Sequence, residues 1–174
     1  MRIFVAIDIP VKILNKIKEI QNKLHNFEGK KTEQENLHLT LKFLGHISKD
    51  EIEEVKKRLR RIKLKGFEAE IDSLGVFDPD SIRIIWLHMT NCEELQREVD
   101  EALSGLFEKE KRFMSHLTIA RVKNVKEINK FFLGLRKIKF DKIKFKVKNF
   151  NLKNSVLSRK GSVYENLEEY DLLQ

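Results

Sequence analysis

A tripeptide of His, Leu and Thr occurs twice in this chain of 174 residues. The first copy lies in residues 37–44, where apolar and polar residues alternate strictly, and the second lies in residues 113–122. Such patterns are typical of a β-strand with one buried face, because successive side chains point to opposite faces. The two copies constrain the fold strongly, since they require two amphipathic strands at corresponding places in two similar halves.

The pattern around each copy is a series of strand, helix, strand, helix and strand. Ser48 and Glu51 form a capping box, which predicts the start of one helix. Two further capping boxes predict the starts of helices in the second half, namely Thr90 with Glu93 and Asn124 with Glu127. Residues 25–35 are polar and are expected to form a loop. The strands are expected over residues 2–8, 37–44, 67–77, 82–89, 113–122 and 137–152, with two short ones near 154–158 and 162–170.

Two similar halves predict an α+β fold with two pseudo-symmetric lobes, whose antiparallel sheets flank a central cleft. The length fits one bilobal domain over residues 1–174. The long strand over 137–152 changes its apolar parity near Asp141 and again near Lys148, which indicates β-bulges. A further irregularity is expected near Ser73.

The spacing within each tripeptide places its polar side chains together. Residues i and i+2 of a strand share a face, so His38 and Thr40 project on one side, as do His116 and Thr118. The opposite side of the first strand is predicted to face the core; it carries Leu37, Leu39, Leu41 and Phe43. If the two lobes face each other, two imidazoles and two hydroxyls meet in one small volume.

Such a set suits acid–base chemistry at a phosphate. Imidazole titrates near neutrality, so one His can remove a proton while the other supplies one. Thr hydroxyls can donate hydrogen bonds to phosphate oxygens, and Arg121 can add a charge-assisted bond. Strict alternation directs Arg121 away from His116, so it reaches the cleft only if the strand bulges. The chain has five His, but neither motif carries a carboxylate or Cys, so no metal site is expected.

The charge distribution points to an anionic partner. From Lys109 to Lys160 there are 17 Lys or Arg and 3 Asp or Glu, in a chain whose net charge is +8. This stretch is either a phosphate-facing surface or an ordinary solvated strand face. The single cysteine, Cys92, suits a reducing, cytoplasmic compartment. No apolar run approaches the roughly 20 residues of a membrane span, so no membrane association is expected.

The paired motifs resemble those of the two-histidine phosphoesterase superfamily, and here they read His38-Leu-Thr40-Leu and His116-Leu-Thr118-Ile. The closer similarity is to the LigT-like RNA 2′,3′-cyclic phosphodiesterases, also called 2′-5′ RNA ligases. It covers nearly the whole chain and is carried by RIFVAIDIP, HLTLKFLG, RIIWL, HLTIARVK and SVLSRKGSVYENL. One departure is Ser115, where many members of the family carry Pro.

The resemblance implies hydrolysis of a ribose 2′,3′-cyclic phosphate to a 2′-phosphate, with 2′-5′ ligation as the reverse reaction. Carried over, His116 is the proton acceptor that activates water, and His38 is the proton donor to the leaving oxygen. Thr40, Thr118 and Arg121 then hold phosphate oxygens. The implied partner is RNA with 2′,3′-cyclic phosphate ends, such as tRNA halves. No cofactor or metal is implied, and a monomer is the default expectation.

Two alternatives stay open on the sequence. One is a non-catalytic RNA-binding module that uses the basic strand from Lys137 to Lys153, but it leaves the paired motif without a role. The other keeps the fold and changes the substrate to another cyclic or 2′-5′ nucleotide, such as ADP-ribose cyclic phosphate or 2′-5′ oligoadenylate. Activity on a nucleoside 2′,3′-cyclic phosphate separates the enzyme from the binding module.

Overall fold

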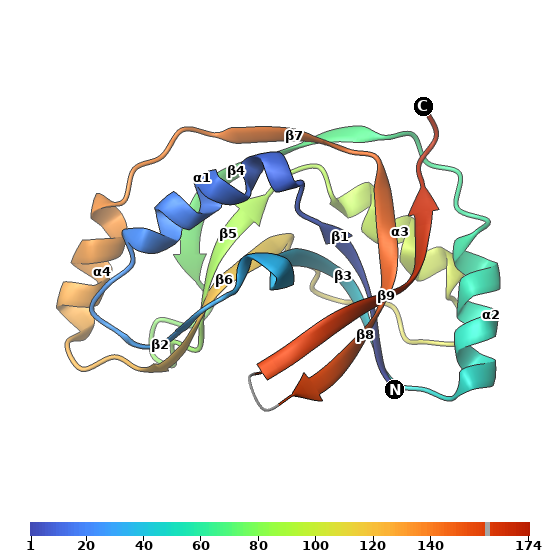
Figure 1. Cartoon of the computed structure of the whole chain (residues 1–174), viewed down its shortest axis with the longest axis horizontal. Helices are drawn as coiled ribbons and strands as arrows, with labels where there is room; N and C mark the ends of the chain where they lie inside the picture. Colours follow the sequence, from blue (N-terminus) through green and yellow to red (C-terminus); the bar gives the residue numbers. More distant parts are fainter. Residues whose placement is uncertain (159–160) are drawn as a thin grey trace.

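The strands of the computed structural model form one curled antiparallel sheet (Figure 1). The structure describes residues 1–158 and 161–174, so Arg159 and Lys160 of the predicted basic stretch lie outside the described residues. The order in the sheet is β7-β4-β5-β6-β3-β1-β8-β9, and β2 pairs with β6 off this path. The strands are β1 (Arg2–Asp8), β2 (Glu28–Lys31), β3 (His38–His46), β4 (Phe67–Val76), β5 (Ile84–Met89), β6 (His116–Asn124), β7 (Ile143–Val147), β8 (Asn149–Ser158) and β9 (Gly161–Asp171).

The predicted antiparallel α+β architecture is confirmed, and the sheets of the two lobes are joined where β3 meets β6. These two strands carry the His-Leu-Thr copies, and their one paired position is Leu39 with Leu117. The lobes do not coincide with the two halves of the sequence. Strand β4 pairs with β5 and β7 in the second lobe, and β8 pairs with β1 in the first lobe. Each half of the sequence therefore gives two strands to the other lobe, β2 and β4 from the first half and β8 and β9 from the second.

The helices are α1 (Val11–Asn22), α2 (Lys49–Leu59), α3 (Glu93–Ala102) and α4 (Ile128–Lys137), with a short 3₁₀ turn, η1, at Gln34–Asn36. The capping box of Ser48 and Glu51 is confirmed. The other two predicted capping boxes are wrong: α3 begins after Cys92 and α4 after Glu127, and neither residue makes a side-chain cap. Thr90 Oγ1 instead accepts a hydrogen bond from the backbone of Glu70 on β4.

The expected loop over 25–35 is also wrong, because it contains β2 and η1. Strand β2 is exposed at every position and pairs with β6. A strand with no buried face has no alternation of apolar residues for the sequence to reveal. It matters for function, since it places two lysines beside the second His-Leu-Thr copy.

The predicted long strand over 137–152 is two strands, β7 and β8, at different places in the sheet. The change of parity near Lys148 marks the point where the chain leaves β4 and joins β1. The irregularity expected near Ser73 is confirmed as a register shift between β4 and β5. No helix in the described part of the chain is long and apolar enough to cross a membrane.

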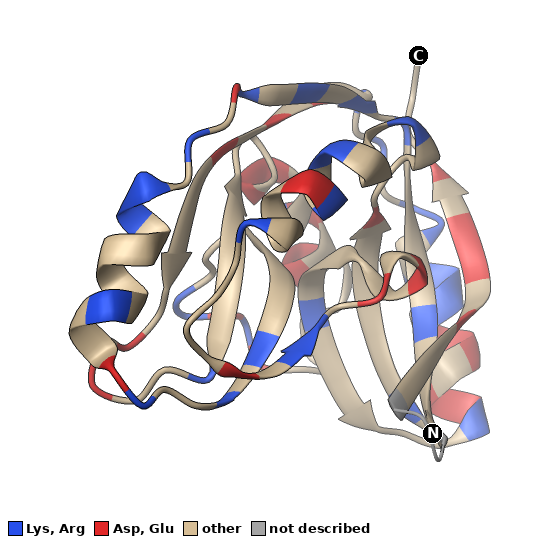
Figure 2. Cartoon of the chain, turned by 60° about the vertical axis from the view of Figure 1, so that its left-hand side comes forward, with Lys and Arg blue, Asp and Glu red and all other residues tan. Residues whose placement is uncertain are grey.

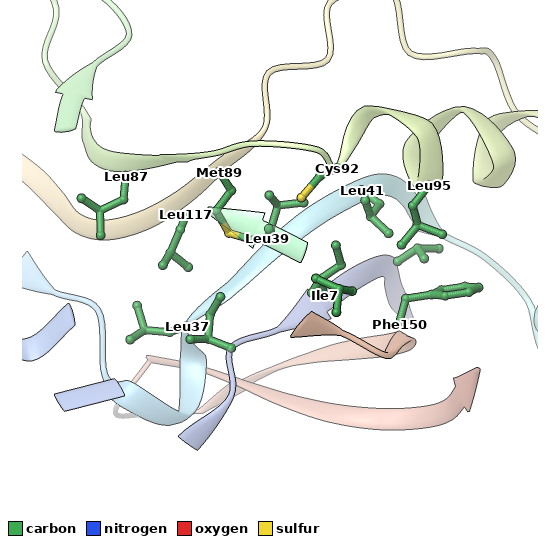
Figure 3. Packing of buried hydrophobic residues seen from close by; sticks show 14 of the residues in the cluster. Ile7, Leu37, Leu39, Leu41, Leu87, Met89, Cys92, Leu95, Leu117 and Phe150 are labelled. Carbon is green, nitrogen blue, oxygen red and sulfur yellow. The ribbon is translucent and has the colours of Figure 1, made fainter. Parts of the chain in front are cut away.

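The core lies behind the two motif strands. Leu39 and Leu117 are fully buried and lie among apolar side chains from several strands and from α3, including Leu87 and Leu95 (Figure 3). Helix α3 packs against β3, and α1 packs against β6. The middle residue of each tripeptide thus anchors its strand in the core, while the His and Thr on either side face away from it.

Candidate active site

The residues of both motifs line one cavity of about 550 Å³. His38 and Thr40 come from β3, and His116 and Thr118 come from β6. Because the strands are antiparallel and paired at their leucines, His38 lies on the side of Thr118, and Thr40 lies on the side of His116. The structure therefore brings together the four side chains that the sequence predicted to converge.

Both imidazoles are held in the same way by the backbone. Nδ1 of His38 is 2.8 Å from the carbonyl oxygen of Asn36, and Nδ1 of His116 is 2.7 Å from that of Met114. A carbonyl only accepts, so Nδ1 carries the hydrogen in each ring. When either ring is neutral, its lone pair is therefore on Nε2, the atom available for proton transfer.

Each imidazole also packs edge-on against an aromatic ring. The ring of Tyr164 lies 4.8 Å from that of His38 at an angle of 81°, and Phe77 lies 4.8 Å from His116 at 89°. Phe4 is a second neighbour of His38, at 5.0 Å. These contacts and the Nδ1 hydrogen bonds restrict the orientation of both rings, which is what a proton-transfer group requires.

Burial dominates the electrostatics of His38 and lowers its pKa to about 4. The positive charges of Lys153 and Arg121 act in the same direction, while the hydrogen bond to Asn36 and the charge of Asp8 oppose it. His38 is therefore neutral at pH 7 in the free protein. An anionic phosphate in the cavity would favour its protonated form.

The pKa of His116 is also lowered by burial, and the hydrogen bond to Met114 opposes this shift. At pH 7 this ring is neutral, with a free lone pair on Nε2. It meets the first requirement of a general base.

A bulge in β6 directs Arg121 into the cavity. Thr118 pairs with Trp86 and Ala120 pairs with Ile85, so Ile119 is an extra residue in β6. The bulge changes the alternation of buried and exposed side chains. Ile119 and Ala120 are both buried, whereas Arg121 is exposed and lines the cavity beside Thr118. The bulged strand that the family resemblance favoured is thus what the structure has.

The backbone carbonyl of Ile119, the extra residue in the bulge, accepts hydrogen bonds from two other parts of the chain. Nε2 of Gln21, a buried residue of α1, donates to the carbonyl oxygens of Ile119 and Thr32, at 2.8 Å each. The backbone N–H of Thr32 donates to the same Ile119 carbonyl at 2.9 Å. Gln21 therefore links α1, the end of β2 and the bulge that positions Arg121.

Strand β3 has a bulge at the equivalent place, and it corrects one prediction. Val5 pairs with Lys42 and Ala6 pairs with Thr40, so Leu41 is the extra residue. Phe43 consequently shares the face of Thr40, lines the cavity and is 65% exposed, whereas the sequence predicted that it faces the core. The signal was in the sequence, because Phe43 follows His38 by five residues, as Arg121 follows His116.

Cations that sequence reasoning did not select complete the lining. Lys30 and Lys31 come from β2, where Lys30 pairs in register with Arg121, and Arg2 comes from β1. Glu33 is the one acidic residue among the described residues that line the cavity. A positive lining of this kind favours a substrate with several negative charges.

The lysines that the sequence offered as a phosphate-facing surface lie elsewhere. Strand β7 is at the far end of the sheet from the cavity, and its lysines occupy that edge in Figure 2. Lys142 and Lys144 form ion pairs with glutamates of β4, namely Glu70 for the first and both Glu68 and Glu70 for the second. This part of the basic stretch forms an ordinary charged strand face.

The other three histidines do not line the cavity. His88 Nδ1 lies 2.9 Å from a carboxylate oxygen of Asp72, and His25 Nδ1 lies 2.7 Å from the carbonyl oxygen of Lys23. His46 is exposed at the end of β3. Across residues 1–158 and 161–174, no group of three or more His, Cys, Asp or Glu is placed to hold a metal ion.

Comparison with known proteins places this geometry in a family. The model of the family described as LigT like phosphoesterase matches residues 7–86 and 89–164. The chain belongs to this family. Among relatives of this LigT-like chain, a protein of Archaeoglobus fulgidus is 34% identical over 98% of the chain and 100% of its own length. One of Methanocaldococcus jannaschii is 35% identical, with the same coverage. Both are named RNA 2′,3′-cyclic phosphodiesterase.

A solved structure supports the same assignment. Escherichia coli LigT, crystallised with 3′-AMP, superposes on the LigT-like chain with a TM-score of 0.79. The two are 27% identical, and the superposition covers 99% of this chain and 98% of the other. The paired motifs, the sheet that joins them and the cavity between them thus belong to a LigT-like phosphoesterase.

Proposed function

We propose that this chain hydrolyses RNA 2′,3′-cyclic phosphate ends to 2′-phosphomonoesters by acid–base catalysis with two histidines. The observation that carries the proposal is the pair His38 and His116, held by the same Nδ1 hydrogen bond on opposite sides of the Leu39–Leu117 pair. The names of the archaeal relatives support the choice of substrate.

His116 acts as the proton acceptor. Its lowered pKa leaves Nε2 unprotonated at neutral pH, so it can take a proton from water as the oxygen attacks phosphorus. The bond between phosphorus and the 3′-oxygen then breaks, which leaves the phosphate on the 2′-oxygen. The negative charge that develops on the phosphate is stabilised by hydrogen bonds from Thr40 and Thr118 and by the guanidinium of Arg121.

His38 acts as the proton donor to the departing 3′-oxygen. Because burial lowers its pKa to about 4, the donor form must be stabilised by the substrate itself. The phosphate monoanion brings a negative charge into the cavity and raises the pKa of His38 in the complex. After the reaction His116 carries a proton and His38 lacks one, and exchange with solvent restores the starting state.

The same geometry supports ligation, since a 5′-hydroxyl can replace water as the nucleophile. A 5′-hydroxyl in place of water, attacking a cyclic phosphate, gives a 2′-5′ phosphodiester with the same acid and base. We extend the proposal to tRNA halves as one source of such ends, and to a single bilobal domain that works as a monomer in the cytoplasm. The buried thiol of Cys92, which forms no disulfide, suits that compartment.

The binding-module alternative finds little support. It relied on the basic strand, but Lys142, just before β7, and Lys144 of β7 are paired with glutamates of β4. The paired histidines would also have no role in it. A different cyclic or 2′-5′ nucleotide as substrate keeps the same site and differs only in what the cavity accepts around the phosphate.

The test is product analysis on a short RNA of defined sequence that ends in a 2′,3′-cyclic phosphate, with a chelator present. The proposal requires a 2′-phosphate product, identified by its stability to a 3′-specific phosphatase and by phosphorus NMR. Tight binding of the RNA without turnover would favour the binding module. A 3′-phosphate product would contradict the assigned direction of cleavage.

A further inference from the structure

An ion pair between β1 and β8 lies close to His38. Nζ of Lys153, on β8, donates to both carboxylate oxygens of Asp8, on β1, at 2.6 and 2.9 Å. The side chain of Lys153 is 7% exposed and that of Asp8 is 38% exposed, so the ammonium is shielded from water while the carboxylate is in contact with it. Removing a charge from water costs free energy, so stability alone is a weak reason for such a pair.

The register of the sheet places both members of the pair on the face of His38. Strand β1 lies between β3 and β8 (Figure 1). Asp8 lies directly opposite His38 across β1 and β3, and directly opposite residues share a face of the sheet. Lys153 lies opposite Phe4 across β1 and β8, and the ring of Phe4 packs on that of His38 at 5.0 Å. The sheet therefore holds a carboxylate next to the imidazole, and an ammonium beside the ring that packs on it.

The pair acts on His38 through its charges. Nδ1 of His38 is bound to the carbonyl oxygen of Asn36. The carboxylate of Asp8 is bound to Lys153 and to Nδ2 of Asn151. The positive charge of Lys153 disfavours the protonated imidazole more than the negative charge of Asp8 favours it. Water explains the difference, because it screens the exposed carboxylate more than the buried ammonium.

Two further groups face His38 from other elements. Arg121, on β6, carries a positive charge that also disfavours the protonated ring. Tyr164, on β9, packs its phenol ring edge-on against the imidazole. Arg121 is assigned to the reacting phosphate, whose negative charge offsets it in the complex. The charges of Asp8 and Lys153 stay next to His38 with or without substrate.

A proton donor must be protonated in the complex and must also release its proton readily. The phosphate provides the first property by bringing negative charge, and a nearby cation provides the second. We infer that Lys153 and Asp8 act through His38 and set its strength as the acid of the reaction. Lys153 promotes transfer of the proton from Nε2 to the 3′-oxygen as the bond from that oxygen to phosphorus breaks, and Asp8 limits this effect. The inference rests on the proposed function, because it takes His38 as the acid.

The test compares the two members of the pair. Lys153→Met removes the positive charge and Asp8→Asn removes the negative charge, while both break the same ion pair. The titration of His38 is followed by NMR in sulfate buffer, an anion of constant charge that stands in for phosphate. Lys153→Met should move the midpoint to higher pH by about one pH unit, and Asp8→Asn should move it to lower pH by a smaller amount. Shifts in the same direction would show that only the loss of the ion pair matters, and would refute the inference.

Controls separate charge from packing. Lys153→Arg keeps the charge and should leave the midpoint of His38 near wild type, so a shift as large as that of Lys153→Met would contradict the inference. Lys144→Met, which removes an exposed charge from β7, should not move it. His116, whose pKa is lowered by burial against the effect of its own Nδ1 hydrogen bond, should titrate alike in every variant. The double variant of Lys153→Met with Asp8→Asn should lie between the two single variants.

Kinetics show whether this control reaches the reaction. The falling limb of kcat on cytidine 2′,3′-cyclic phosphate should move to higher pH in Lys153→Met and to lower pH in Asp8→Asn. Shifted midpoints with an unmoved limb would contradict the role of His38 as the acid in the proposed function, and would support its coupling to the pair. Unmoved midpoints in an enzyme that hydrolyses this substrate would refute the inference and leave the proposed function intact. If Asp8→Asn fails to fold because Lys153 is left buried without a counter-charge, Lys153→Met and the double variant decide in the same way.

Discussion

Leu39 and Leu117 are paired partners, and theirs is the only paired position that joins β3 to β6 in the described part of the chain. Both side chains are fully buried, so the middle residues of the two motifs are fixed in the core. The His and Thr on either side consequently face the cavity as a pseudo-two-fold set. One pair of leucines thus positions the two groups that the proposed reaction needs.

Replacing either member of the pair should remove most of the activity. His38→Ala and His116→Ala should each lower kcat by about 10²–10⁴, the usual loss of a general acid or base, while circular dichroism and the unfolding midpoint stay near wild type. The double variant should lose far less than the product of the single effects, because the two act in one step. His46→Ala, an exposed histidine of β3 outside the cavity, is the control and should keep wild-type activity.

The pH dependence follows from the direction of both pKa shifts. The productive form of the free enzyme has His38 protonated and His116 neutral, and burial lowers the pKa of both below 6.5. Above pH 6.5 most molecules have lost the proton of His38, so kcat/KM on cytidine 2′,3′-cyclic phosphate should fall as the pH rises. The falling limb of kcat should lie at higher pH, because the bound phosphate raises the pKa of His38. A kcat/KM that increased from pH 6.5 to 8 would be incompatible with these shifts.

The bulge in β6 gives a prediction for a residue outside the cavity. Gln21→Met removes the side-chain hydrogen bonds to Ile119 and Thr32, and should lower the free energy of unfolding by about 1–3 kcal/mol. It should also reduce turnover, because Arg121 reaches the phosphate only through the bulge. Urea unfolding and steady-state kinetics measure the two effects, with the exposed Lys18→Met on the same helix as control.

Combining Gln21→Met with Arg121→Ala tests whether Gln21 affects turnover through the position of Arg121. If Gln21 acts through Arg121, the double variant should lose less activity than the product of the two single losses. Fully independent effects on kcat/KM would show that Gln21 contributes to stability alone.

Removing the lysines in and just before β7 should have little effect on RNA binding. The triple change of Lys142, Lys144 and Lys146 to Gln breaks exposed ion pairs with β4, which solvent screens. Binding of a ten-nucleotide RNA and its salt dependence should therefore stay close to wild type, as measured by fluorescence anisotropy. A large loss of RNA affinity would show instead that these lysines form the phosphate-facing surface that the sequence left open.

Much of the fold was accessible from the sequence because it depends on local patterns. Alternation predicted β1, β3 and β6, and the Ser48 capping box predicted the start of α2. Periodicity reports which face of a strand is buried but not which strand lies beside it. For this reason the run over 137–152 gave one strand instead of two, and the exposed β2 was missed.

The residues of the candidate site were likewise predictable where local spacing decides their position, and not where the pairing of strands decides it. The four His and Thr side chains were predicted to converge, because their spacing alone decides their face. Phe43 was placed in the core, because strict alternation cannot anticipate an extra residue at Leu41. Arg2 and Lys31 were not selected, since only the sheet order brings their strands to the cavity.

The assignment of His38 as the acid and His116 as the base is tested most directly by the pH dependence of the single variants. The residual kcat/KM of His116→Ala and of His38→Ala is measured on cytidine 2′,3′-cyclic phosphate from pH 4 to pH 9. With the base removed, His116→Ala should show only the limb of the remaining acid, so its rate falls as the pH rises. With the acid removed, His38→Ala should show only the limb of the remaining base, so its rate rises with pH to a plateau. The opposite pair of profiles would exchange the two roles, and two unchanged bell-shaped profiles would contradict the two-histidine mechanism.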